Sequence, residues 1–337
     1  MKRSRALVSL ALETLKSNVE RTGDPMGFKK VYWTRWAGGF DLPREGSRIL
    51  LTARMYQMLP YVIQTTGMVE RMKPLLAIKG AGRLMAFGNR LAGETVIRMK
   101  AWRAGDIAGR GAKVLRGIIG ALAAVGVHPG YLHEDEPYSG VLLHDLGLEE
   151  AVVPHIRKVY RLLKDRGAKE VITVDPHTTY MLREVYPRHI PGFDLGVRNY
   201  LELLAESEAP FRAPRSAALP ARMVLHDSCV MTRDLDIVTP ARTVLRRLGI
   251  EVVEPESAGK DTACCGGPVE YAFADLSRSV SCIRARELAA AGSDVAVACP
   301  ICLINLMKHE GPLGIRIWDV GGILDCAAGA GEGRSHG

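Results

Sequence analysis

The first 228 residues of this 337-residue chain contain no cysteine, and all seven cysteines follow in the last third. A disulfide framework would be spread along a small secreted chain, so this distribution argues against one. No apolar run approaches the ~18 residues that a membrane-spanning helix needs. The apolar stretch from Ala6 to Leu12 is followed by Glu13 and Lys16 without a small-residue cleavage site, unlike a signal peptide. The sequence therefore predicts a cytoplasmic protein with no transmembrane segment.

Amides are also scarce, with only two glutamines and four asparagines, a depletion typical of thermophilic proteins. No glycine-rich stretch stands between a predicted strand and a predicted helix with phosphate-loop or dinucleotide spacing. We therefore expect no NAD or FAD on this chain. Apolar residues make up 47% of the sequence, which is enough to form the cores of two domains.

Positive charge is concentrated at one end. Residues 1–120 contain 22 Lys and Arg against 8 Asp and Glu, a net charge of +14, and the remainder carries −6. These basic residues are scattered among Met and Leu, and no motif that reads nucleic acid is present. The charge therefore indicates an acidic protein surface or a membrane face as the partner, and no nucleic acid.

Five cysteines stand out by their spacing. Cys229 is followed by the adjacent pair Cys264-Cys265 and then by a CxxC motif, Cys299 to Cys302. Thiolates are the ligands that iron–sulfur clusters and zinc prefer. Gly266-Gly267 permit the sharp bend that would let two neighbouring thiols face one metal centre. Zinc needs only four ligands, so the fifth cysteine favours iron and sulfide, and zinc remains the alternative cofactor.

The other two cysteines fall outside this pattern. Cys282 lies in a predicted helix from Phe273 to Ala290, and Cys326 lies near the end of the chain. We expect both to be small buried apolar residues, which is the common role of a free cysteine.

Three segments resemble the cysteine-rich CCG domain of heterodisulfide reductase subunits B and D and of related iron–sulfur oxidoreductases, including the C subunit of anaerobic glycerol-3-phosphate dehydrogenase. They are Val224–Cys229, Ala263–Gly267 and Ala298–Cys302. In heterodisulfide reductase, the five cysteines of one such motif hold a noncubane [4Fe-4S] cluster that cleaves a disulfide by one-electron steps. The resemblance implies the same cluster here, with five ligands: Cys229, Cys264, Cys265, Cys299 and Cys302.

This resemblance also implies an oxidoreductase subunit that acts within a complex on a disulfide or thiol substrate. One alternative is the electron-relay subunit of a flavin-dependent 2-hydroxyacid or glycerol-3-phosphate dehydrogenase, and another is a zinc-bearing assembly subunit without a redox role. Multi-domain relatives carry a ferredoxin CxxCxxCxxxCP run, which this sequence does not contain. We therefore expect the partner to be a separate ferredoxin-like iron–sulfur or flavin subunit, with any peripheral membrane association made through it.

From Ile49 onward, predicted strands alternate with predicted helices, a pattern typical of parallel sheets covered by helices. The two halves repeat each other: Ile49–Leu51 matches Met223–Leu225, and Val171–Val174 matches Val295–Ala298. The predicted fold class is α/β, with two similar cysteine-rich-type domains and an N-terminal helical arm. The expected boundaries are a basic arm at 1–45, a first domain at 46–200 with an insertion at 57–108, a CCG domain at 201–326 and a flexible tail at 327–337.

The first domain lacks the thiols. Ala53 stands in place of Cys229, Tyr138-Ser139-Gly140 in place of the Cys-Cys-Gly, and Asp175-Pro176-His177-Thr178 in place of the CxxC motif. We expect no cluster there, and a role in packing, substrate shaping or docking instead. Asp175 and His177 with His133 or Glu134 would suit a harder metal, but helix capping is the commoner use of such residues.

His226 and Asp227 precede Cys229 at a predicted strand end. His226 is the candidate catalytic residue, as a proton donor to a departing thiolate. The alternative is that both side chains only hydrogen-bond the loop that carries Cys229.

The arm and the insertion are predicted to contact the redox partner. Methionines in and beside the insertion would supply adaptable apolar contacts, although burial in a core is the commoner use of methionine. They are Met55, Met58, Met68, Met72, Met85 and Met99.

Overall fold

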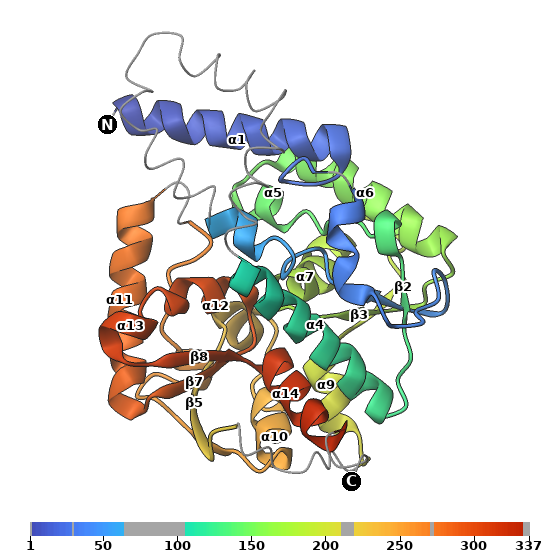
Figure 1. Ribbon diagram of the computed structural model, residues 1–337. Helices are drawn as coiled ribbons and strands as arrows, with labels where there is room; N and C mark the ends of the chain where they lie inside the picture. Colours follow the sequence, from blue (N-terminus) through green and yellow to red (C-terminus); the bar gives the residue numbers. More distant parts are fainter. Residues whose placement is uncertain (1, 29, 64–104, 210–218, 270–272, 333–337) are drawn as a thin grey trace.

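A computed structural model describes residues 2–28, 30–63, 105–209, 219–269 and 273–332. Two four-stranded parallel sheets, each covered by helices, form the centre of this structure (Figure 1). The predicted α/β class with two similar units is confirmed. None of the described helices combines the length and the apolar character that crossing a membrane requires.

The internal repeat extends to strand order and register. The first sheet has the order β2-β1-β3-β4 and the second has the order β6-β5-β7-β8. In the central pairs, Ile49 is opposite Val171 and Val224 is opposite Val295. The strands are β1 (Arg48–Leu51), β2 (Gly130–Tyr131), β3 (Glu170–Thr173), β4 (Gly196–Asn199), β5 (Arg222–His226), β6 (Glu251–Val253), β7 (Asp294–Val297) and β8 (Arg316–Asp319).

Helices follow most of these strands and close both sheets. Those of the first half are α1 (Lys2–Thr22), η1 (Lys30–Trp33), η2 (Arg35–Ala37), α4 (Gly105–Ala124), η4 (His133–Asp135), α5 (Val141–Asp145), α6 (Glu149–Asp165), α7 (Pro176–Tyr180), the π-helical η5 (Met181–Val185), α8 (Tyr186–His189) and α9 (Tyr200–Glu206). Those of the second half are the π-helical η6 (Val230–Asp234), α10 (Pro240–Arg247), η7 (Gly259–Asp261), α11 (Ala274–Ala291), α12 (Pro300–Met307), α13 (Glu310–Leu313) and α14 (Val320–Glu332). Helices α6 and α11 take corresponding places before β3 and β7, and α4 and α10 take corresponding places before β2 and β6.

The arm is only partly peripheral. Helix α1 packs on α6, and the segment after it is built into the core (Figure 1). The carboxylate of Asp24 accepts a hydrogen bond from Arg54 at 2.6 Å, and both side chains are buried. Trp33 and Trp36 are also buried. Aromatic burial and this internal ion pair attach Asp24, Trp33 and Trp36 to the first half of the structure.

The C-terminal tail and the methionines in and beside the insertion were also the subject of predictions. Helix α14 continues to Glu332 and buries Ala327, so 327–332 is helical where a flexible tail was predicted. Met55 and Met58 are buried in the core, so neither forms a docking surface. Most of the insertion lies outside the described residues, including Met68, Met72, Met85 and Met99.

Helices α4 and α14 cross at glycines and so join the two halves. A Cβ atom added to Gly117 on α4 would lie 2.0 Å from the carbonyl oxygen of Gly321 and 2.6 Å from the amide nitrogen of Asp325. Neither distance is compatible with van der Waals contact. The absence of a side chain at Gly117 therefore sets how closely these helices approach.

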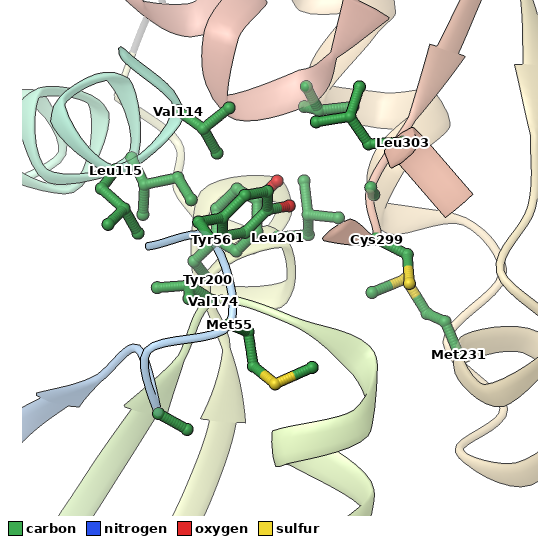
Figure 2. Packing of buried hydrophobic residues seen from close by; sticks show 14 of the residues in the cluster. Met55, Tyr56, Val114, Leu115, Val174, Tyr200, Leu201, Met231, Cys299 and Leu303 are labelled. Carbon is green, nitrogen blue, oxygen red and sulfur yellow. The ribbon is translucent and has the colours of Figure 1, made fainter. Parts of the chain in front are cut away.

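A buried polar contact also joins the halves. The hydroxyl of Tyr56 donates to Oδ2 of Asp319 at 2.7 Å, and Oδ1 of Asp319 accepts from the amide of Gly321 at 2.9 Å. Tyr56 lies among apolar side chains from both halves, including Leu201 and Leu303 (Figure 2). Burial raises the pKa of Asp319 to about 7, against the lowering effects of these two hydrogen bonds.

We predict that Gly117→Ala lowers the free energy of unfolding by about 1–3 kcal/mol, because the new methyl group forces α4 away from α14. Gly120→Ala is the matched control on the same helix, since a Cβ at Gly120 meets no atom within 4 Å. That variant should be neutral or more stable by up to about 1 kcal/mol, since alanine has the higher helix propensity. Urea unfolding measures both values. Equal stability of the two variants would contradict the close crossing.

A second prediction concerns pH. The folded-state pKa of Asp319 lies above the unfolded value near 3.8, so the folded protein binds this proton more tightly. Its stabilising contribution is complete below pH 4 and is lost as pH rises through about 7, a change of about 4 kcal/mol. We expect Asp319→Asn to remove this component from the pH dependence of unfolding. An unchanged profile would contradict the assignment.

Candidate metal centre

The carboxyl edge of the second sheet holds the five cysteines of the pattern. Cys229 comes three residues after β5 and directly before η6. Cys299 is the N-terminal cap of α12, two residues after β7, and Cys302 lies in the first turn of that helix. The Cys264-Cys265 pair lies between η7 and α11, on the connection that leaves β6. Since parallel strands end at the same edge, three distant segments deliver their thiols to one place.

The five thiols form a continuous series of side-chain contacts. Hydrogen bonds between sulfurs link Cys229 to Cys264, Cys264 to Cys265, Cys265 to Cys302, and Cys302 to Cys299. Cys265, Cys299 and Cys302 are buried, whereas Cys229 and Cys264 are half-buried. Such a set of soft donors fits an iron–sulfur cluster and exceeds the four ligands of a structural zinc site. The end of the series formed by Cys229 and Cys264 is therefore the part that is accessible from solvent.

The hydrogen-bonded thiols compete for protons. Hydrogen bonds from Cys229 and Cys265 lower the pKa of Cys264 to about 2, and the same hydrogen bonds raise the pKa values of Cys229 and Cys265. Burial opposes ionisation of Cys299, yet hydrogen bonds with Cys302 and His177 hold its pKa well below the usual range. So many thiols in close contact cannot all ionise unless a cation compensates their charge.

The bend after the vicinal pair depends on Gly266. Its φ of +88° lies in the left-handed region, and an added Cβ would lie 2.5 Å from the carbonyl oxygen of Ser277 on α11. The amide of Gly266 donates to the Sγ of Cys264 at 3.3 Å. Glycine therefore allows the pair to turn towards the other thiols while the loop packs directly on α11. The first half keeps this bend, since Gly140 also has a φ of +88°.

Two arginines hold the loops around the thiols in place by hydrogen bonds. Arg242 makes two hydrogen bonds to the carboxylate of Asp227, at 2.8 and 2.7 Å. The same carboxylate accepts from the amide of Gly259 at 2.6 Å. Arg233 donates to the carbonyl oxygens of Lys260 and Thr262, in the segment that leads to the Cys-Cys pair. These contacts connect the Cys229 loop to the loop after β6.

His226 lies against the thiols and is fully buried. A ring nitrogen of His226 and the sulfurs of Cys265 and Cys302 lie within 4.8 Å of one another. Its Nδ1 accepts a hydrogen bond from Nε of Arg284 on α11 at 3.0 Å. Burial and the positive charge of Arg284 lower the pKa of His226 to about 3, so its ring is neutral near pH 7. Its catalytic role stays a prediction.

The first half contributes one side chain to the centre. His177 on α7 contacts Cys299, and its Nδ1 lies 3.7 Å from Oδ2 of Asp145. Both partners raise the pKa of His177 well above its usual range, although burial opposes this. The contact crosses between the halves, because α7 packs on η6.

The alternative metal site in the first half does not assemble. Asp175 caps α7 by accepting from the amide of Thr178 at 2.9 Å. His133 contacts the carbonyl oxygen of Leu42, and Glu134 pairs with Arg44. Among the described residues, the metal-ligating group found is His226, Cys265 and Cys302. Helix capping is therefore the observed use of Asp175.

Sequence reasoning singled out the five cysteines and His226 but missed Arg284 and Asp145. Arg284 lies 55 positions after Cys229 in the middle of α11, where an arginine is ordinarily exposed. Nothing in the local sequence marks it as buried. His177 was noted by its place in the repeat, which is a usable signal once the two halves are aligned.

Comparison with known proteins supports the same assignment. Residues 223–307 match the model of the "Cysteine-rich domain" family, CCG. The predicted resemblance is confirmed. All five cysteines of the pattern lie within the matched segment, which extends from β5 to the end of α12.

Similar curated proteins are named as redox proteins. One is the "EtfAB:quinone oxidoreductase" of Syntrophomonas wolfei, 27% identical over 324 residues, covering 91% of this chain and 39% of that protein. A second is a "Probable membrane-anchored ferredoxin" of Chromohalobacter salexigens, 26% identical over 66% of this chain and 34% of that protein. A third is the "Probable iron-sulfur-binding oxidoreductase FadF" of Bacillus subtilis, 26% identical over 60% of this chain and 29% of that protein.

This chain therefore spans between 29% and 39% of the length of these relatives. The family match and the relatives' names support an iron–sulfur redox role for it.

We predict that Cys265→Ser abolishes the visible absorption of the native centre, because serine replaces a soft thiolate with a poor ligand for iron. Cys264→Ser should do the same. Cys282→Ser and Cys326→Ser are the matched controls, since neither thiol joins the series of sulfur contacts among the described residues. They should keep the spectrum and change stability by no more than about 0.5 kcal/mol. Equal loss of the spectrum in Cys282→Ser would show that the ligand set is misassigned.

Proposed function

We propose that this chain is an iron–sulfur electron-transfer subunit that holds one noncubane [4Fe-4S] cluster through Cys229, Cys264, Cys265, Cys299 and Cys302. The observation that carries the proposal is the convergence of five thiols in a single contact series at one sheet edge. A bound cluster would supply reversible one-electron chemistry. The protein would keep that chemistry out of water on the buried side and accessible on the Cys229 and Cys264 side.

Two reactions are compatible with this arrangement. In the heterodisulfide reductase type, a disulfide takes up two electrons and two protons and leaves as two thiols, with the electrons supplied one at a time by a partner subunit. In the relay type, electrons pass from a flavoprotein towards an acceptor. The name of the Syntrophomonas relative, EtfAB:quinone oxidoreductase, favours the relay type. A half-exposed thiol edge suits either a docking redox partner or a disulfide.

In this proposal, His226 is not the acid that protonates a departing thiolate. Its neutral ring lacks an ionisable proton to give a departing thiolate near pH 7, so protons for disulfide cleavage would come from solvent at the open edge. Zinc with a non-redox role is the less favoured alternative, because five converging sulfurs leave one thiol without a function in a tetrahedral site.

The expected partner is a ferredoxin-like iron–sulfur or flavin subunit, with a cytoplasmic location. The basic charge of residues 1–120 would favour an acidic partner surface. Removing residues 1–45 would also remove the buried Asp24, Trp33 and Trp36, so deletion would unfold the first sheet rather than test docking. Charge reversal at exposed sites on this part, such as Lys30 and Arg44, is the cleaner test of that interface.

The fourth prediction concerns metal content. Protein produced and purified anaerobically should be brown and should bind about four iron and about four sulfide per chain. Colorimetric iron and sulfide assays with mass spectrometry of the native protein measure both. Stoichiometric zinc without iron, in protein made under iron-replete anaerobic conditions, would overturn the cluster proposal.

A further inference from the structure

Arg284 is a buried cation beside the thiols, and its surroundings hold it in one orientation. It donates from Nη1 to the carbonyl oxygen of Ser257 at 3.0 Å and from Nη2 to Oγ1 of Thr262 at 3.3 Å. Its Nη1 also lies 2.8 Å from Oε2 of Glu287. With these partners, Nε is left to face the Nδ1 atom of His226 at 3.0 Å.

This contact determines the tautomer of His226. An arginine N–H can only donate, so the Nδ1 that faces it must be the unprotonated acceptor nitrogen. The neutral ring then carries its proton on Nε2. This Nε2 is fully buried and has no hydrogen-bond partner among the described residues. A buried N–H without an acceptor is costly, which indicates that an acceptor belongs there.

The same tautomer makes His226 a poor metal ligand. A histidine that ligates through Nε2 normally donates its Nδ1–H to an acceptor on the other side of the ring. Here the opposite side is occupied by a donor, Arg284, so ligation would bring two N–H groups together. The grouping of His226 with Cys265 and Cys302 within 4.8 Å is therefore better explained by hydrogen bonding than by coordination.

We propose that His226 donates its Nε2–H to the sulfur of Cys265 or Cys302, and that Arg284 is the positioning residue that keeps the proton on Nε2. The inference deepens the proposed function and rests on it where the bound cluster is concerned. An N–H···S hydrogen bond and a nearby buried cation both favour the more negative, reduced state of the centre. The His226 and Arg284 pair therefore raises its reduction potential.

The tautomer is tested first on the metal-free, reduced protein, which keeps this inference independent of cluster binding. Nitrogen-15 NMR of histidine-labelled protein should show one ring with Nε2 protonated and Nδ1 unprotonated, and the signal should vanish in His226→Gln. A ring protonated on Nδ1 would overturn the proposal. Arg284→Lys keeps a donor next to Nδ1 and should preserve the tautomer. Arg284→Met removes that donor, so the ring should no longer be restricted to the tautomer protonated on Nε2.

The loaded protein gives the second readout. In an EPR-monitored redox titration, His226→Leu should shift the midpoint potential to a more negative value, and His226→Gln, which retains an N–H, should restore part of the shift. His309→Gln is the matched control, because His309 is also buried but contacts Ser281. Its potential should match that of the parent protein.

Pulsed EPR with nitrogen-15 histidine separates the remaining outcomes. A weak coupling that disappears in His226→Leu supports a hydrogen bond, and a strong coupling typical of a coordinated nitrogen overturns the proposal. An unchanged potential in His226→Leu with full iron content also overturns it. Absence of iron from the parent protein contradicts the proposed function instead, and the NMR result then decides the inference alone.

Discussion

The structure depends on one requirement: five sulfurs that are separated by up to 73 positions in sequence must come within contact of one another. No local element can do this. A parallel sheet can, because β5 and β7 lie side by side and their carboxyl ends open at the same edge. The loops that follow them are short, and Asp227, Arg242 and Arg233 hold them in place through hydrogen bonds.

The half without thiols supports the half that has them. Its sheet has the corresponding strand order, its glycine bend at Gly140 persists, and Asp175 occupies the N-cap position of α7 as Cys299 occupies that of α12. Two of its side chains reach across: His177 contacts Cys299, and Tyr56 donates to Asp319. The close crossing of α4 and α14 at Gly117 holds the two halves in this arrangement. The first half thus closes the buried side of the centre.

The buried positive charges near the thiols are paired with carboxylates. A buried arginine, two buried histidines and three of the five thiols lie together in the interior, where electrostatic interactions are strong. Arg284 is compensated by Glu287, and His177 by Asp145, so each of these two cations has its own carboxylate. This pairing lets positive groups lie beside the thiols without leaving a buried charge unpaired.

Sequence by itself determined the α/β class, the internal repeat, the segments of the four strands β1, β3, β5 and β7, and the five-cysteine pattern. These features are written in local alternation, in glycine positions and in spacing along the chain, which need no knowledge of distant contacts. It did not reveal the buried segment around Trp33, the helical end of α14, or the roles of Arg284 and Asp145. Those depend on which residues meet after folding, since burial and hydrogen-bond partners come from segments far apart in the chain. The proton position on His226 is of this second kind, because it is set by an arginine 58 residues away that becomes its neighbour only in the folded protein.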